Sequence, residues 1–299
     1  MSLSATKSNS GVTKFCQVRL EIGSTISRGQ IVNSKLFASL TGVVIIFATH
    51  GLAVEVTELA GAEHGYPGLC DINGKKLADG EFRQWMEDER LHVVITYKFP
   101  DGRVWEENAL FRQQPELIQE KWSWKELRDG KPEREFAADL STGTASAHIS
   151  KDNKDVTDKI DIVPGQTFAG FGFTIALGNL RPRLVKGEII DLKAVGFSPI
   201  PTLKPQVVTV KVSHAGLNKM KMSGRYLRGD NFLIHPEVPI IAKLFIKVPD
   251  THIWLTAGRP PGFLRWEGSI VFPNDEMIRV DLVSDHAGGP PEPVEAKKQ

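Results

Sequence analysis

The sequence predicts a mainly β protein, built as a curved antiparallel sheet or a (half-)barrel with one or two helices against it. Two observations support this fold class. Between residues 91 and 283, short segments with apolar residues at every second position recur, and turns rich in Gly, Pro, Asn and Asp separate them. Residues 167–180, by contrast, place apolar side chains near helical spacing. Many such strands with few helices are typical of a curved sheet, whose concavity can enclose a ligand.

No internal repeat and no linker interrupts this pattern. We therefore expect a single β-rich domain over residues 54–284. Residues 285–299 are rich in Gly, Pro and Lys and are expected to form a disordered tail. Residues 1–53 are expected to be an N-terminal extension that ends in an export signal.

The start of the domain is expected to be irregular. Residues 55–80 are rich in Gly, Asp and Asn and show little periodicity. Residues 81–89 carry Phe82 and Trp85 three positions apart, which favours a short helix.

The clearest strand pattern begins at residue 91. Strict alternation over residues 91–99, a turn with Gly102 and renewed alternation from residue 104 predict a β-hairpin over residues 91–111. Residues 238–248 fit a buried helix or a strand equally well. Further strands are expected at residues 117–127, 134–140, 144–150, 154–163, 188–197, 207–213, 219–227, 265–271 and 277–283.

The apolar run at residues 36–47 is typical of the h-region of a secretory signal peptide. Lys35 precedes it, and Gly51 and Ala53 occupy the positions that a signal peptidase requires, so cleavage is expected after Ala53. Since residues 1–31 form an unusually long lead, we hypothesise that translation begins at Val32. The alternative is an uncleaved membrane anchor, the one route by which the chain is expected to touch a membrane. The expected location is the periplasm or the exterior of a bacterial cell.

Charge and cysteine content exclude several classes of protein. The chain has 37 basic and 36 acidic residues. Residues 1–53 hold five of the basic residues and one of the acidic ones, so 32 and 35 remain after cleavage, a net charge of −3. Nucleic acid is therefore not an expected partner. Cleavage also removes Cys16 and leaves Cys70 as the single thiol, which excludes an internal disulfide.

Catalytic and cofactor signatures are missing from the sequence. It contains no G-x-S-x-G, no H-E-x-x-H and no histidine pair at metal-ligand spacing. The glycine-rich residues 165–172 lack the Lys-Ser/Thr of a phosphate-binding loop. No metal and no cofactor is therefore expected.

One polar group stands out as a candidate ligand-binding site: His252, Trp254, Arg265 and Glu267. If both segments are strands, His252 shares a face with Trp254, and Arg265 shares one with Glu267, with Trp266 opposite. These four side chains are predicted to form a polar spot at the mouth of an apolar cavity. The more ordinary interpretation is a cross-strand ion pair on a solvated face, with Trp266 packed in the core.

The signal, the β meander and residues 260–268, Pro-Pro-Gly-Phe-Leu-Arg-Trp-Glu-Gly, resemble uncharacterised exported β-rich proteins. Some of these have open half-barrels like the periplasmic lipoprotein carriers. The resemblance implies a concave sheet but supplies no catalytic residues. The leading hypothesis is a non-enzymatic protein that binds an apolar or amphipathic small molecule or lipid. A lipocalin-like isomerase or hydratase, with His252, Arg265 and Glu267 as acid–base groups, is the second. A structural or assembly component of the cell envelope is the third.

Overall fold

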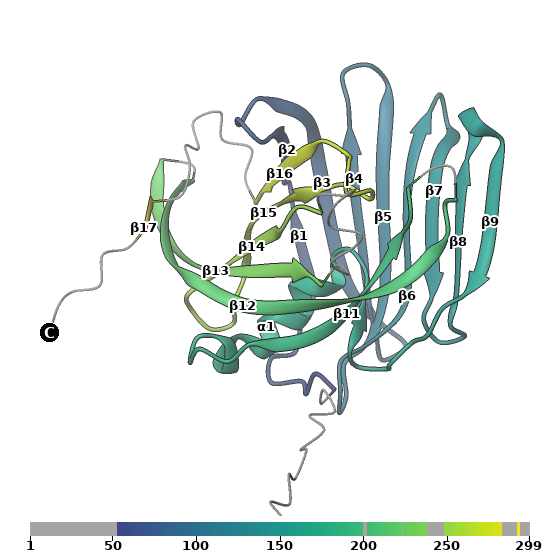
Figure 1. Ribbon diagram of the computed structural model, residues 1–299. Coiled ribbons are helices and arrows are strands. Elements are labelled where there is room, and N and C mark those ends of the chain that lie inside the picture. Colours follow the sequence, from purple (N-terminus) through teal and green to yellow (C-terminus); the bar gives the residue numbers. More distant parts are fainter. Residues whose placement is uncertain (1–52, 200–201, 223, 238–247, 283–291, 294–299) are drawn as a thin grey trace, which may run out of the picture. The chain divides into compact units, whose positions relative to one another are not determined.

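The strands of the computed structural model pair into one long, strongly curved sheet (Figure 1). The structure describes residues 53–199, 202–222, 224–237, 248–282 and 292–293, which all fall in one compact unit, Thr49–Gln299. The predicted export signal, Cys16 and residues 238–247 lie outside the described residues. The predicted fold class, a mainly β protein with a curved antiparallel sheet, is confirmed.

The first half of the described chain consists of strands and one short 3₁₀ helix. Their bounds are β1 Glu63–Gly65, β2 Gly68–Asp71, β3 Lys76–Glu87, β4 Arg90–Lys98, β5 Arg103–Arg112, β6 Ile118–Arg128, β7 Lys131–Asp139, β8 Thr144–Ile149, the 3₁₀ helix Ser150–Asp152 and β9 Lys154–Lys159.

The second half adds the α-helix and eight further strands. Their bounds are β10 Thr167–Phe168, α1 Gly172–Leu184, β11 Ile190–Phe197, β12 Pro205–Met222, β13 Arg225–Pro236, β14 Thr251–Thr256, β15 Phe263–Ser269, β16 Met277–Asp281 and β17 Glu292–Pro293. The last of these lies within the range that the sequence assigned to a tail, and it pairs with Asn218 and Lys219 of β12.

Neighbouring strands in the sheet are mostly neighbours in sequence. The pairing runs from β10 through β11–β16 to β2, and then through β3 to β9, while β1 adds to the edge of β3. All these pairs are antiparallel except β10 with β11. The pairing of β16 with β2 joins the two halves of the chain. Among the described strands, β9 pairs only with β8 and β10 only with β11, so the sheet does not close.

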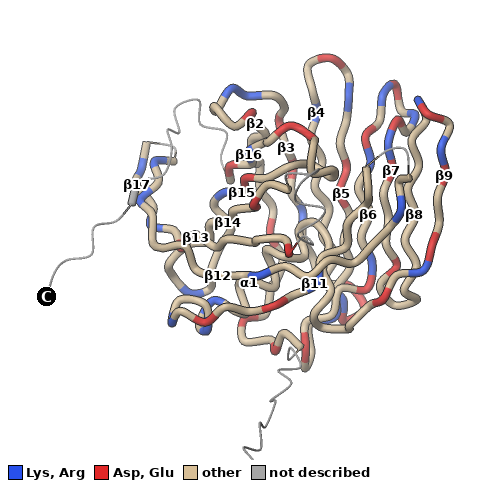
Figure 2. Tube along the Cα trace, in the orientation of Figure 1, with Lys and Arg blue, Asp and Glu red and all other residues tan. Residues whose placement is uncertain are grey.

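Alternation explains which face of each strand is buried. On β4, Leu91, Val93, Ile95 and Tyr97 point into the core, and the predicted hairpin with β5 is confirmed. Gly102 in its turn has φ +85°, which a glycine adopts without strain. The outward positions carry charges of both signs, as β7 and β9 show in Figure 2.

Two predictions for the first 40 residues of the domain are wrong. Residues 81–89 are not a helix, because β3 pairs with β4 from Asp79 to Glu87. The three-residue spacing of Phe82 and Trp85 resembles a helix, but pairing with a neighbouring strand overrides such a local pattern. Residues 55–80 are not irregular throughout, since they contain β1, β2 and the start of β3.

The region around Gly216 also differs from its prediction. Residues 207–213 and 219–227 were expected to be two paired strands. Residues 205–222 instead form the single strand β12, which pairs with β13 from Val210 to Met222. The register shifts between His214 and Gly216, where Gly216 has φ +117°. The glycine therefore marks a β-bulge that bends the strand, and not a turn that ends it.

The helix is shifted from its predicted range of residues 167–180. Thr167 and Phe168 form β10, and α1 begins only at Gly172. Its apolar side chains, among them Ala176, Leu177 and Leu180, are buried in the same hydrophobic core as the strands. Helix α1 thus covers part of the inner face of the curved sheet.

A buried ion pair fixes α1 to the sheet. Arg181 donates from Nε to Oδ2 of Asp230 on β13 at 2.7 Å, and from Nη2 to the carbonyl of Ala257 at 2.8 Å. The other oxygen of Asp230 lies 3.1 Å from Nε2 of His214. Both members of the pair are largely buried, so each depends on the other for compensation of its charge.

We expect Asp230→Ala to lower the free energy of unfolding by about 3–5 kcal/mol, because it leaves the Arg181 charge buried without its partner. Urea denaturation checks this. Glu188→Ala is the matched control, since it breaks the exposed Arg183–Glu188 pair near the end of the same helix and should leave the urea midpoint unchanged. Equal midpoint shifts for both variants would contradict the role given to Asp230.

Candidate functional site

A cavity of about 530 Å³ lies between the inner face of the sheet and the start of α1. Its volume is in the range of sites for small organic molecules. Strands β1–β6, β15 and β16, the segment before α1 and the first turn of α1 contribute to its wall. Eight aromatic side chains line it: Phe82, Tyr97, Trp105, Trp122, Trp124, Phe171, Phe263 and Trp266.

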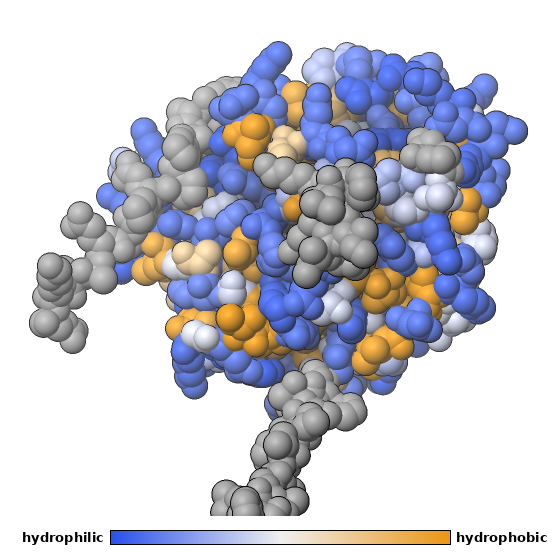
Figure 3. Space-filling view, viewed as in Figure 1, coloured by the Kyte–Doolittle hydropathy of each residue, from blue (hydrophilic) through white to orange (hydrophobic). Residues whose placement is uncertain are grey.

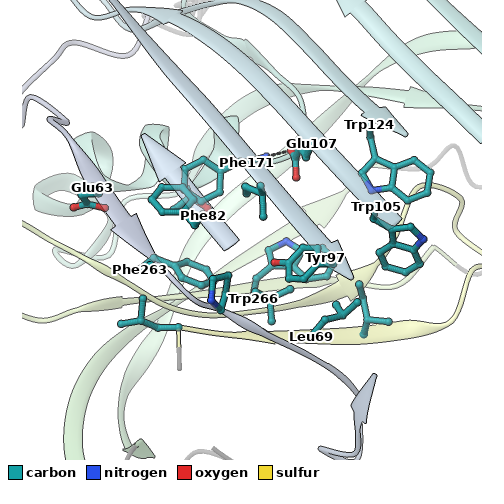
Figure 4. Close-up of a pocket in the computed structure, with 18 of the residues that line it drawn as sticks. Glu63, Leu69, Phe82, Tyr97, Trp105, Glu107, Trp124, Phe171, Phe263 and Trp266 are labelled. Carbon is teal, nitrogen blue, oxygen red and sulfur yellow. Dashed lines mark hydrogen bonds between the residues drawn. The ribbon is translucent and has the colours of Figure 1, made fainter. Parts of the chain in front are cut away.

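The aromatic residues are distributed along the length of the cavity (Figure 4). Phe171 contacts Phe82 and Phe263, with ring centroids 5.3 and 6.4 Å apart, on the side of the cavity near Glu63. Trp105 and Trp124, 5.5 Å apart, lie on the other side. Glu63 is exposed and the three phenylalanines are partly exposed, so the cavity opens to solvent at the Glu63 end.

A carboxyl group interrupts this apolar lining. Glu107 lies on the inward-facing side of β5, as Trp105, Ala109 and Phe111 do. It stands directly opposite Ile95 of β4. Its Oε1 accepts a hydrogen bond from the backbone N–H of Phe171 at 2.7 Å. The same oxygen accepts a second from Nε1 of Trp122 at 2.9 Å. In the described part of the chain, Oε2 has no hydrogen-bond partner, and Glu107 lines the cavity.

Burial raises the pKa of Glu107 above the ordinary value of a glutamate, since the low-polarity surroundings disfavour the charged form. The hydrogen bonds from Phe171 and Trp122 oppose this rise. Burial also raises the pKa of Tyr97, and the nearby Glu107 adds to that rise. The tyrosine therefore stays a neutral hydroxyl in the cavity, and the glutamate protonates more readily than one in water.

The glycine-rich segment before α1 has its structural reason here. A Cβ on Gly170, which has φ +50°, would lie 2.0 Å from Oε1 of Glu107 and 2.3 Å from Nε1 of Trp122. A Cβ on Gly172 would lie 2.3 Å from Oε1 of Gln119. Gln119 is buried and holds both the N–H and the carbonyl of Ala169, at 2.7 and 3.1 Å. The glycines therefore allow strand side chains to approach the backbone, and no phosphate-binding loop is needed to explain them.

The structure brings the four predicted site residues together on adjacent strands. In the pairing of β14 with β15, His252 stands opposite Glu267 and Trp254 opposite Arg265. All four lie on the face turned away from the cavity, whereas Trp266 lines the cavity. Their role in ligand binding stays a prediction.

The predicted group forms a partly buried polar layer. Arg265 is only 1% exposed; its Nε lies 2.5 Å from Asp281 and its Nη1 3.6 Å from Glu267. His252 and Trp254 contact Asn231 and Asn218 at 3.1 and 2.8 Å.

Burial shifts the pKa values of His252 and Glu267, which stand opposite each other on β14 and β15. It raises the pKa of Glu267 against the opposing effect of Arg265, and it lowers the pKa of His252. Both shifts favour the neutral forms of these two side chains, which form a cross-strand pair.

Sequence reasoning missed the cavity residue Glu107. The sequence did contain a signal, which is the place of Glu107 in the alternation of its strand. The other residues on that side are Trp105, Ala109 and Phe111, and an acidic residue is unusual among them.

Within the described ranges, no group of three or more His, Cys, Asp and Glu is placed to hold a metal ion. None of the helices described there has the length and apolar character to cross a membrane.

Comparisons with known proteins give a weak structural likeness. No protein-family model and no curated protein matches the sequence. Among solved structures, the chain is similar to a beta-barrel-like protein of domain of unknown function DUF1849 from Brucella abortus. The TM-score is 0.43 at 11% sequence identity, over 78% of this chain and 97% of the other.

We expect Gly170→Ala to lower the free energy of unfolding by about 3 kcal/mol or more, because the new methyl group meets the Glu107–Trp122 hydrogen bond as well as an unfavourable φ. Gly102→Ala is the matched control: its φ is also positive, but nothing lies within 4 Å of the added Cβ, so only about 1 kcal/mol should be lost. Chemical denaturation measures both. Similar losses would show that the close approach at Gly170 is unimportant.

The raised pKa of Glu107 predicts a pH-dependent effect of Glu107→Gln on stability. Between the ordinary pKa of the unfolded chain and the raised native pKa, the native state binds more protons, so the wild type loses stability as the pH rises. The amide of the variant keeps an oxygen for both N–H donors and has no such loss. The stability of the variant relative to wild type should therefore increase from pH 4 to pH 8 in urea titrations. A constant or decreasing difference would contradict the raised pKa.

Proposed function

We propose that this protein binds an apolar or amphipathic small molecule, a lipid included, in the cavity between the curved sheet and α1, without catalysing a reaction. The observation that carries the proposal is the lining of eight aromatic residues around a volume of about 530 Å³. Burial of apolar surface against such walls supplies most of the binding free energy of a small ligand.

Partly exposed aromatic side chains at the open end support the same proposal. Phe82, Phe171 and Phe263 contact one another beside the exposed Glu63. Leaving three phenylalanines partly in water costs free energy, which a bound apolar molecule would recover by covering them.

The isomerase or hydratase alternative has less support. It requires acid–base groups that converge on the ligand, but His252, Arg265 and Glu267 face away from the cavity on β14 and β15. A structural role in the cell envelope would be favoured by a large apolar patch. On the face seen in Figure 3, apolar residues form small groups among hydrophilic ones.

Export is part of the proposal, and it rests on the sequence pattern of residues 36–47. Expression of the full chain in a bacterium, followed by fractionation and N-terminal sequencing, tests it. A periplasmic product that begins at Val54 would support a cleaved signal. A cytoplasmic product that retains residues 36–47 would overturn it.

We expect the protein to bind the neutral probe N-phenyl-1-naphthylamine, with a change in tryptophan emission because four of the six tryptophans line the cavity. Phe171→Ala should weaken binding about tenfold, roughly 1.4 kcal/mol, since it removes a ring from the wall but keeps the backbone N–H. Tyr226→Ala, at an exposed site outside the cavity, is the control and should bind as wild type does. No binding, or an equal loss in both variants, would count against the cavity as the site.

A further inference from the structure

We infer that the molecule held in the cavity is an amphipathic cation, an amine with an apolar body, whose positive charge lies against Glu107. The inference rests on the proposed function, because it specifies the ligand class of the same cavity. It draws on the charges that line the wall, on the hydrogen bonds of Glu107 and on the aromatic rings around it.

The charges that line the cavity are of one sign. Glu63 and Glu107 line it, and none of the described lining residues is Lys or Arg. Among those described lining residues, His64 is the one that can carry a positive charge, and its Nε2 is 3.0 Å from Glu81 at the exposed end. A cavity with this lining repels a carboxylate or sulfate headgroup and attracts an ammonium group.

Glu107 has no countercharge among the residues that the structure describes. In the part of the chain that the structure describes, it takes part in no ion pair, and both its hydrogen bonds come from N–H groups on one oxygen. An ionised carboxylate in an apolar wall is costly unless a cation pairs with it. A bound ammonium would supply the missing charge and a hydrogen bond to Oε2.

The simpler role for Glu107 is to fix the segment before α1. That role explains the two hydrogen bonds that Oε1 accepts from the N–H groups of Phe171 and Trp122. The side-chain oxygen of a glutamine could accept the same two bonds. It does not explain a second oxygen that lacks a hydrogen-bond partner among the described residues of an apolar cavity. The carboxylate, as distinct from an amide, is accounted for by a positively charged ligand.

Aromatic rings around the carboxylate favour the same chemistry. Tyr97, Trp122 and Trp266 line the cavity together with Glu107, and Figure 4 shows Tyr97 and Glu107 in its middle part. The faces of such rings attract cations, most strongly where water is excluded. Their apolar surface also suits the rest of an amphipathic molecule.

Displacement of bound N-phenyl-1-naphthylamine by three ligands of one chain length tests the inference at pH 7.5: dodecylamine, dodecanol and dodecanoate. We expect dodecylamine to displace the probe at a concentration at least tenfold lower than dodecanoate, with dodecanol between them. Glu107→Gln should remove most of the preference for the amine and leave dodecanol unaffected, because the amide keeps the hydrogen bonds from Phe171 and Trp122. Glu106→Gln is the matched control, because it removes the neighbouring charge on the outward side of β5, outside the cavity lining, and it should keep the preference.

The outcomes separate the two proposals. If the probe does not bind to the wild type, the proposed function fails. If the probe binds but dodecanoate or dodecanol competes as well as dodecylamine, the cavity is a binding site and the inference of a cation is overturned. If Glu107→Gln folds with the near-ultraviolet circular dichroism of the wild type and retains the full preference for the amine, the assignment to Glu107 is overturned.

Discussion

Two hydrogen bonds to one carboxylate oxygen determine how the inner face of this protein is organised. Oε1 of Glu107 receives the backbone N–H of Phe171 and the indole N–H of Trp122, which ties strands β5 and β6 to the residue that precedes α1. Gln119 holds Ala169 next to it through two further bonds. Gly170 and Gly172 permit this approach, because side chains there would collide with Glu107 and Gln119. The start of α1, and with it one wall of the cavity, is therefore set by side chains of the sheet.

The curvature of the sheet gives this carboxylate its surroundings. Because β16 pairs with β2, strands from the two halves of the chain face the same cavity, and Trp266 and Phe263 of β15 join Tyr97 and Trp105 of the first hairpin in its wall. Burial among these rings raises the pKa of Glu107. The ionisation of this carboxyl group therefore depends on the charge of any molecule in the cavity. Structure and proposed function thus depend on the same side chain: one oxygen positions the backbone, and we propose that the other faces the ligand.

Sequence periodicity predicted most of the sheet because alternation is a local property. The hairpin of β4 and β5 followed directly from it. Features set by pairing with a neighbouring strand were not predictable from the spacing within one segment: β3 has helix-like spacing but pairs with β4, and Gly216 marks a bulge where a strand boundary was expected. The prediction of the candidate site was limited in a similar way. The two-residue periodicity of a strand placed His252 on one face with Trp254, and Arg265 on one face with Glu267. It could not show which face of β15 borders a cavity, because that depends on how the whole sheet curves.

The most direct test is a titration of the Glu107 carboxyl carbon by ¹³C NMR, with the signal assigned by its loss in Glu107→Gln. We expect an apparent pKa above the ordinary glutamate value in the empty protein, because burial without a countercharge disfavours ionisation, and a fall in that pKa when dodecylamine is bound. A carboxyl that titrates at its ordinary value in the empty protein, or whose pKa dodecylamine leaves unchanged, would contradict the role of this partly buried carboxylate in binding a cation.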